Sequence, residues 1–300
     1  MGLKADEWWD TGSLVKEILK KGRSLIRPGA KIVDICEELE LIIRNEGYKP
    51  AFPVNISINE IAAHYTADPY DRSRIPNSAL VKLDVGVVSK NGAISDAAIT
   101  IPINVDRKLE LLVKVTKEAL LRAIETIRDG VSLGEIGRVI WEVAHEQGFG
   151  VLRDLGGHQI NRWQLHAGIT IPNVPRRFTP KLREGMIIAI EPFLIAAPED
   201  SRSKSDMSHI NIFSIVNPHN DRILGLLYSK FKKLPFALRW LKKAKEDMKF
   251  YRSMYRYLLE RHMEGKVAIY PALVEIRGRW VAQFEHTVLV KTNSAEILTG

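Results

Sequence analysis

Acidic side chains occupy positions of this sequence where a β-strand would normally carry an aliphatic residue. Asp84 lies in the apolar run at 81–86, and Asp96 lies in the run at 94–99, on the strand expected to return from it. Burying an ionised carboxylate is costly unless a cation or hydrogen-bond donors compensate. A single strand Asp usually faces solvent, but two of them across one hairpin favour a shared metal ion.

Three further residues share this character. Glu191 ends an apolar strand-like run, and Glu285 lies inside another. His158 follows a pair of glycines, which let the backbone come close to a ligand. Four carboxylates and one imidazole suit hard or borderline divalent ions, and carboxylates can bridge two ions about 3.5–4 Å apart.

The chemistry that this set predicts is hydrolysis. A bridged pair of ions lowers the pKa of a shared water and supplies a nucleophile at neutral pH. The ions also give a free amino group and a scissile carbonyl something to bind. We therefore expect hydrolysis of an amide bond next to an N-terminus.

The single cysteine, Cys36, excludes an internal disulfide and lies in an amphipathic stretch typical of packing.

A faint internal repeat indicates how the chain positions these residues. The segment IRPGAKIVDI at 26–35 matches IRDGVSLGEI at 127–136, and each begins a helical pattern that ends at a glycine. Another helix is expected before each copy, over 11–26 and 106–128, with Asp106 as the N-cap of the second. The two halves therefore look like copies of one unit.

Short β-type runs lie between and after these helices. Residues 80–88 and 93–103 predict a hairpin whose turn contains Asn91 and Gly92. Duplicated helical units with antiparallel strands predict an α+β fold, with a central sheet, helices on one side and a site between the halves. Further strands are expected at 186–192, 210–216, 272–277 and 280–291.

Residues 207–270 interrupt this plan. They carry 13 Lys and Arg against 5 Asp and Glu, which accounts for the whole net charge of +8. Helices are expected at 236–243 and 247–263, and with the strands that follow they would form a winged-helix-like unit. The second helix presents a stripe typical of core packing, so we expect no DNA binding. The basic charge favours either a solvated face or contact with an anionic neighbour such as ribosomal RNA.

Five segments closely resemble type II methionine aminopeptidases. The resemblance covers nearly the whole chain in order, and it implies the pita-bread fold, with pseudo-twofold halves around a central antiparallel sheet. It divides the chain into a catalytic domain at 1–206 and 271–300 and an inserted helical subdomain at 207–270. Because the chain starts almost at the catalytic domain, it looks like the archaeal form. The segments are NEIAAHYT at 59–66, LDVG at 83–86, GH at 157–158 with HAG at 166–168, IEPF at 190–193 and QFEHT at 283–287.

The resemblance implies a role for each of the five metal-ligand candidates. Asp96 and Glu285 would bridge both ions. Asp84 would complete one site, and His158 with Glu191 would complete the other.

The resemblance also implies residues that bind substrate. His64 and His166 would line the substrate side and stabilise the scissile carbonyl and its tetrahedral intermediate. They stand at nearly equivalent places in the two repeats, as a symmetric pair at a cleft would. Phe52, His209 and Tyr270 match positions that line the pocket for the methionine side chain.

One spacing departs from the family pattern. Asp84 and Asp96 are twelve positions apart, one more than the resemblance leads us to expect. We expect the extra residue in the turn at 89–92. A shift within the strand would instead turn Asp96 to the other face of the sheet, because side chains alternate with period two.

The resemblance implies that the protein is an enzyme that removes the initiator methionine from nascent proteins and uses two divalent metal ions to do so. Cobalt, manganese, iron and zinc all suit the ligands. The expected partner is a peptide or nascent-protein N-terminus, with possible ribosome contact through the basic insert. No long apolar run and no signal-like N-terminus appear, so we expect a cytoplasmic protein without membrane contact. We also expect a monomer, although the sequence carries no signal of the oligomeric state. Two alternatives stay open: an Xaa-Pro peptidase of the same fold, and a non-catalytic relative that binds RNA or ribosomes.

Overall fold

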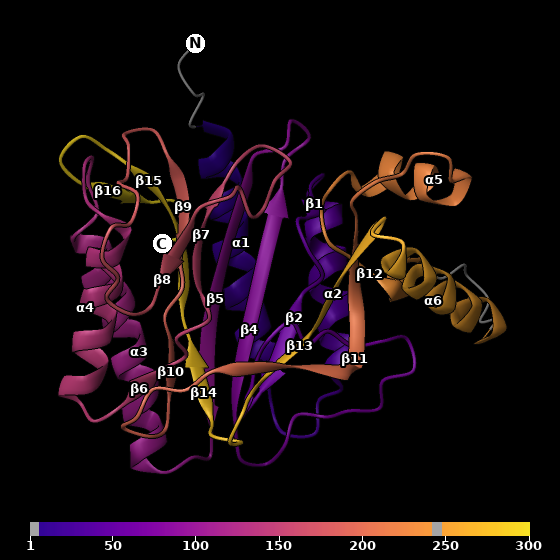
Figure 1. The fold of residues 1–300 in the computed structure, drawn as a ribbon. Helices are drawn as coiled ribbons and strands as arrows, with labels where there is room; N and C mark the ends of the chain where they lie inside the picture. Colours follow the sequence, from indigo (N-terminus) through magenta and orange to yellow (C-terminus); the bar gives the residue numbers. More distant parts are fainter. Residues whose placement is uncertain (1–5, 242–247) are drawn as a thin grey trace.

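A nine-stranded sheet forms the centre of the molecule (Figure 1). The computed structural model describes residues 6–241 and 248–300. The main path of the sheet runs β1-β4-β5-β15-β9-β7-β8, with β2 beside β4 and β16 beside β15, and its neighbouring strands pair antiparallel. The strands are β1 (Lys49–Pro50), β2 (Asn55–Ile58), β4 (Ala79–Val88), β5 (Ile94–Ile103), β7 (Gly156–Ile160), β8 (Thr170–Pro172), β9 (Ile187–Ile190), β15 (Glu285–Val290) and β16 (Ala295–Ile297).

Two smaller antiparallel sheets adjoin this one. The three-stranded sheet follows the order β14-β10-β6, and the four-stranded sheet follows the order β12-β11-β13-β3. The first contains β6 (Gly150–Val151), β10 (Phe193–Ile195) and β14 (Val281–Gln283), and the second contains β3 (Ile61–Ala63), β11 (Ser203–Ile215), β12 (Phe236–Ala237) and β13 (Val267–Glu275).

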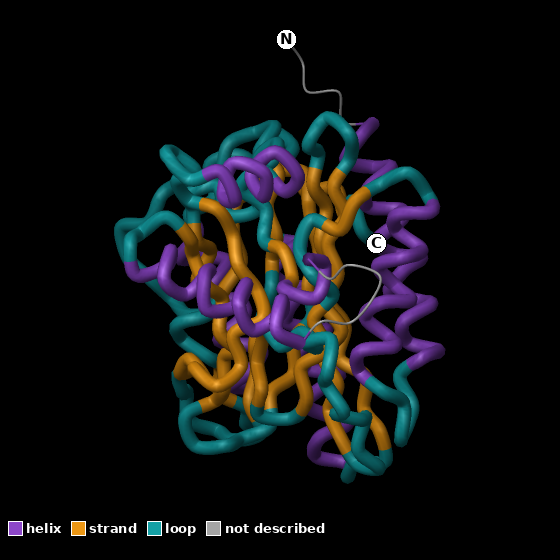
Figure 2. The backbone as a smooth tube through the Cα atoms, turned by 90° about the vertical axis from the view of Figure 1, so that its right-hand side faces the viewer, coloured by secondary structure: helices purple, strands orange, loops and turns teal. Residues whose placement is uncertain are grey.

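Two pairs of helices cover the sheet, one from each half of the chain. The first pair is α1 (Asp6–Leu25) and α2 (Ile32–Asn45), and the second is α3 (Arg107–Glu125) and α4 (Leu133–Glu146). In the side view of Figure 2 long helices line one side of the strands. The Asp106 side chain accepts a hydrogen bond from the Leu109 amide at 2.9 Å, which confirms the expected N-cap.

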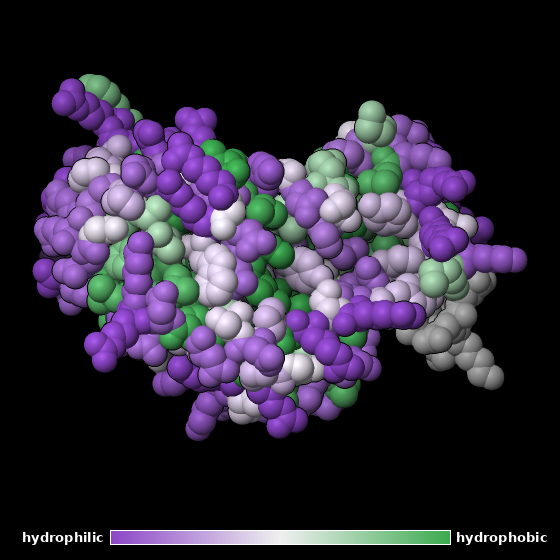
Figure 3. Space-filling model, turned by 90° about the horizontal axis from the view of Figure 1, so that it is seen from below, coloured by the Kyte–Doolittle hydropathy of each residue, from purple (hydrophilic) through white to green (hydrophobic). Residues whose placement is uncertain are grey.

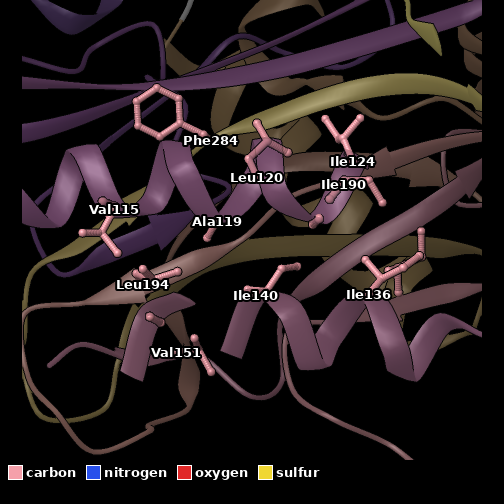
Figure 4. Packing of buried hydrophobic residues seen from close by; sticks show 14 of the residues in the cluster. Val115, Ala119, Leu120, Ile124, Ile136, Ile140, Val151, Ile190, Leu194 and Phe284 are labelled. Carbon is pink, nitrogen blue, oxygen red and sulfur yellow. The ribbon is translucent and has the colours of Figure 1, made fainter. Parts of the chain in front are cut away.

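Two large apolar clusters repeat this two-part plan. One gathers side chains of α1 and α2 against β2, β4 and β5. The other gathers Leu120 and Ile124 of α3, Ile140 of α4, and Ile190 and Leu194 of the strands into one layer (Figure 4). Each helix pair therefore buries its apolar stripe on its own half of the sheet, as the repeat predicts.

The prediction of one strand at 280–291 is wrong in one respect, because the strand is interrupted at Phe284 and forms two strands. The part before Phe284 is β14, which pairs with β10 in the small sheet. The part after it is β15, which pairs with both β5 and β9 and so joins the two halves. One apolar run therefore serves two sheets, which its alternation alone does not reveal.

The insert differs most from expectation. Its first helix, α5 (Arg222–Phe231), was not expected. The expected helix at 236–243 is wrong at its start, because β12 pairs with β11 and a single 3₁₀ turn, η1 (Leu238–Leu241), follows. Residues 242–243 and 247 of the expected helices lie outside the described residues. The second expected helix is α6 (Met248–Met263).

The face of the molecule seen in Figure 3, from below the view of Figure 1, is mostly hydrophilic, with apolar side chains in scattered groups. None of the helices in the described ranges combines the length and the apolarity that crossing a bilayer requires.

A buried ion pair fixes the insert to the body. The Arg239 guanidinium of η1 bonds the Glu40 carboxylate of α2, and both side chains are almost fully buried. Arg239 also donates to the Thr66 hydroxyl at 2.7 Å and to the Ala67 carbonyl at 2.8 Å. The indole N–H of Trp240 donates to the same Glu40 carboxylate.

Replacing Arg239 with Met is expected to destabilise the protein by about 3–5 kcal/mol, because the buried Glu40 would lose its buried cation. The half-exposed Arg44, 3.4 Å from Glu40, would be its remaining ion-pair partner. Urea unfolding followed by circular dichroism measures this loss. The double variant Glu40→Leu/Arg239→Met should recover part of it, because no buried charge is then left unpaired, while the Val54 amide loses its acceptor. A double variant no more stable than the single one would contradict this account.

Candidate metal centre

The hairpin of β4 and β5 places Asp84 and Asp96 on one face of the central sheet. Gly86 stands opposite Asp96 in the register, and Asp84 lies two residues before Gly86 on the same strand. Directly opposed residues share a face, and so do residues two apart. The turn at 89–92 closes with the Ser89 amide bonded to the Ala93 carbonyl at 2.8 Å. The twelve-residue spacing therefore leaves both carboxylates on the same side.

Three other strands bring the remaining ligand candidates to this face. His158 lies on β7, Glu191 directly follows β9, and Glu285 begins β15, which lies between β5 and β9. His158 Nε2 lies 3.5 Å from Asp96 Oδ2 and 3.9 Å from both Glu191 Oε1 and Glu285 Oε1. Potential ligand atoms of Asp96, His158 and Glu285 all lie within 4.8 Å of one another.

All five side chains line one small cavity of about 60 Å³, which we call the inner cavity. Burial raises the pKa of all four carboxyl groups, that of Asp96 to about 6. The charge of Asp96 raises the pKa of Asp84 further, and the neighbouring carboxylates do the same for Glu191 and Glu285. Four acids crowded in a buried space repel one another unless cations lie between them.

The residues present fit a pair of divalent cations. Asp84 Oδ1 is buried without a hydrogen-bond partner among the described residues, although an unpaired carboxylate oxygen is costly to bury. Burial lowers the pKa of His158 to about 4, so at neutral pH this imidazole is uncharged and has a nitrogen lone pair for a metal. Oxygen-rich donor sets with one imidazole suit hard or borderline divalent ions.

Two glycines make room for this arrangement. A Cβ at Gly86 would lie 2.3 Å from the ring of Phe52, which lines the inner cavity. A Cβ at Gly157 would lie 2.1 Å from the carbonyl oxygen of Ala189 on β9. Gly86 and Gly157 are therefore required, because neighbouring atoms lie too close to the backbone for any side chain to fit.

His64 and His166 both line the inner cavity. The His166 ring lies 4.5 Å from the His158 ring, and the His64 ring meets the Tyr270 ring edge-on at 5.8 Å. Burial lowers the pKa of both imidazoles to about 4, so each is neutral near pH 7 and has one N–H to donate.

Three residues were expected to line the pocket for the methionine side chain, and the structure places two of them in the inner cavity and one outside its lining. Phe52 and Tyr270 line the inner cavity. His209 does not; its side chain is 46% exposed and bonds Asp206 at 2.7 Å. Sequence reasoning missed Asn55, Leu165, Ile212 and Pro235, which also line the cavity.

A further group of polar side chains holds the ligand candidates in place. The Thr287 hydroxyl donates to Asp96 Oδ1 at 2.7 Å and accepts from the Asp96 amide at 2.9 Å. The Gln283 amide donates to Glu191 Oε2 at 3.3 Å. Thr287 follows Glu285 by two residues, so period-two alternation could have placed it on the same face.

Replacing Thr287 with Val is expected to weaken divalent-metal binding about 10- to 100-fold, the usual cost of losing a residue that orients a ligand. The shape is kept, but Asp96 loses a hydrogen bond that fixes its orientation. Titration of metal-free protein with Mn²⁺, followed by calorimetry, measures the change. The variant Thr292→Val, on the exposed turn after β15, is the control, and equal affinities in both variants would contradict this role.

Three comparisons with known proteins point to the same family. The model for metallopeptidase family M24 matches residues 9–292. A methionine aminopeptidase of Methanothermobacter thermautotrophicus is 39% identical over 303 residues, covering 98% of each chain. One of Saccharolobus solfataricus is 41% identical over 282 residues, covering 91% of this chain and 90% of the relative. The crystal structure of methionine aminopeptidase from Thermotoga maritima superposes with a TM-score of 0.72 at 26% identity, covering 99% of this chain and 96% of the other.

Proposed function

The chain belongs to metallopeptidase family M24, and from this premise we propose that it is a methionine aminopeptidase that removes the first methionine of other polypeptides. The observation that carries the proposal is the inner cavity, where four carboxyl groups, two of them buried and two partly buried, converge with a neutral imidazole. The substrate is the N-terminus of a peptide or protein. An Xaa-Pro peptidase and a non-catalytic relative are not favoured, because the curated relatives covering almost the whole chain are methionine aminopeptidases.

We assign the five acidic and imidazole side chains to two divalent ions. Asp96 and Glu285 would contact both ions, since they lie on neighbouring strands at the middle of the set. Asp84 would complete one site, and His158 and Glu191 the other. When bound, the ions supply a water nucleophile at neutral pH and polarise the scissile carbonyl.

The remaining side chains of the inner cavity position the substrate. His64 and His166 donate hydrogen bonds to the carbonyl oxygen as it gains negative charge, because each neutral ring carries one N–H. Phe52, Ile212 and Tyr270 offer an apolar surface for the methionine side chain. His209 would reach this surface only by leaving Asp206, so its expected role stays a prediction.

The test is release of free methionine from Met-Ala-Ser by protein loaded with cobalt, manganese or iron. We expect release with at least one of these metals, and a much slower reaction with an Ala-Pro substrate. A chelator should stop the reaction and fresh metal should restore it. No release with any metal, or a preference for Ala-Pro, would count against the assignment.

We also propose that residues 207–270 act as a separate subdomain with a ribosome-facing surface. The strands β11 and β13 both continue from the body into this segment. Arg252 and Arg256 lie one helical turn apart on the exposed side of α6, where anionic RNA could bind them. Co-sedimentation with ribosomes, with and without Arg252→Glu/Arg256→Glu, tests this contact. Unchanged co-sedimentation of the variant would remove it.

We further propose that the enzyme works in the cytoplasm as a monomer, where nascent N-termini are available. Sedimentation equilibrium at a mass other than one chain would contradict the monomer.

A further inference from the structure

A second, larger cavity lies beside the inner one. Its volume is about 720 Å³, within the range of about 300–1,000 Å³ typical of ligand sites. It lies between α2 and β1 of the body on one side and the segment from α5 to η1 on the other. We call it the outer cavity.

The two cavities share a wall. Pro235 lines both of them. The loop after β7 contributes Trp163 to the outer cavity and Leu165 to the inner one. The two cavities therefore adjoin at Pro235.

Aromatic rings give the outer cavity an apolar floor. Trp163, Phe231 and Trp240 all line it. The Phe231 ring lies 5.9 Å from the Trp240 ring and stacks on Phe236 at 4.6 Å, so both rings are held in place by packing. Rigid, flat surfaces of this kind bind apolar and aromatic side chains with little loss of conformational entropy.

Positive charge dominates the rim of the outer cavity. The two cations Arg239 and Arg44 share the single carboxylate Glu40, which leaves one positive charge in excess. Among the other described residues that line the cavity, Lys49 and Lys230 carry positive charge, against the single acid Glu37. Lys49 and Lys230 are exposed to solvent. Such a rim favours a ligand with negative charge.

We propose that the outer cavity binds the stretch of substrate that follows its first two residues, and that it prefers acidic and aromatic side chains there. The proposal rests on the proposed function, because a polypeptide substrate must continue somewhere beyond the residue that is removed. The inner cavity, at about 60 Å³, has no room for that continuation. The adjoining outer cavity has the room, the rings and the charge.

Three peptides test the preference. Met-Ala-Ser has a single uncharged residue after its first two, and serves as the reference within each protein. Met-Ala-Ser-Glu-Phe-Glu should show kcat/KM about fivefold above that of Met-Ala-Ser-Lys-Gly-Lys, the size expected from two exposed charge pairs. The variant Lys49→Glu/Lys230→Glu should abolish or reverse this ratio, and Lys49→Ala/Lys230→Ala should give an intermediate one.

The control variant is Lys108→Glu/Lys114→Glu on α3, which changes the net charge equally at exposed positions outside the outer cavity. It should keep the wild-type ratio, which separates a local contact from long-range attraction. Equal kcat/KM for the two hexapeptides in the wild-type protein, or an equal change in both double variants, would overturn the inference. Failure of the wild-type protein to cleave any of the three peptides would overturn the proposed function instead.

Discussion

Replacing Glu285 with Gln should reduce methionine release from Met-Ala-Ser by more than about 100-fold, beyond the usual cost of losing a residue that merely orients a ligand. Glu285 begins the strand that lies between β5 and β9, and one of its oxygens is 3.9 Å from His158 Nε2. Gln has nearly the same shape, so the fold should persist. It lacks the negative charge that a ligand shared between two cations supplies.

The measurement combines three readouts on the same sample. These are methionine release, metal content by mass spectrometry, and the far-ultraviolet circular dichroism spectrum. Glu118→Gln, at an exposed position of α3, is the matched control and should behave as wild type. Normal turnover and two bound ions in Glu285→Gln would remove Glu285 from the ligand set.

The variants His64→Ala and His166→Ala should each lower kcat about 10²- to 10³-fold, the usual effect of removing one hydrogen-bond donor to a developing oxyanion. Both rings line the inner cavity but neither is assigned as a ligand. Metal content should therefore stay at the wild-type value, unlike that of Glu285→Gln. This contrast distinguishes the two kinds of residue.

His145→Ala, on α4 outside the inner cavity, is the control for loss of a histidine. It should leave kcat unchanged. A loss of bound metal in His64→Ala or His166→Ala would show that the residue is a ligand, and an unchanged kcat would show that it has no part in the reaction.

The fold class could be predicted because two signals in the sequence are strong. The repeat gave the paired helices, and the hairpin turn at 89–92 gave the β4–β5 register on which Asp84 and Asp96 depend. The pita-bread fold implied by the family resemblance is confirmed by the match to family M24 and by the solved relative.

The parts that could not be predicted depend on contacts distant in sequence. Nothing in the apolar run around Phe284 shows that its two ends join different sheets. Pro235 reaches the inner cavity only because β12 pairs with β11, which local propensity does not encode. His209 was placed by resemblance alone, and its bond to Asp206 involves a bulge in β11 that alternation does not foresee.

The position of β15 has a consequence for how the chain folds. This strand comes from the last part of the sequence, yet it lies between β5 of the first half and β9 of the second. Pairings across so many residues form slowly, because the entropy of closing the long loop must be overcome first. During refolding, the ability to bind metal should therefore appear only after helix formation is complete. A partly folded chain would therefore have no peptidase activity toward other polypeptides.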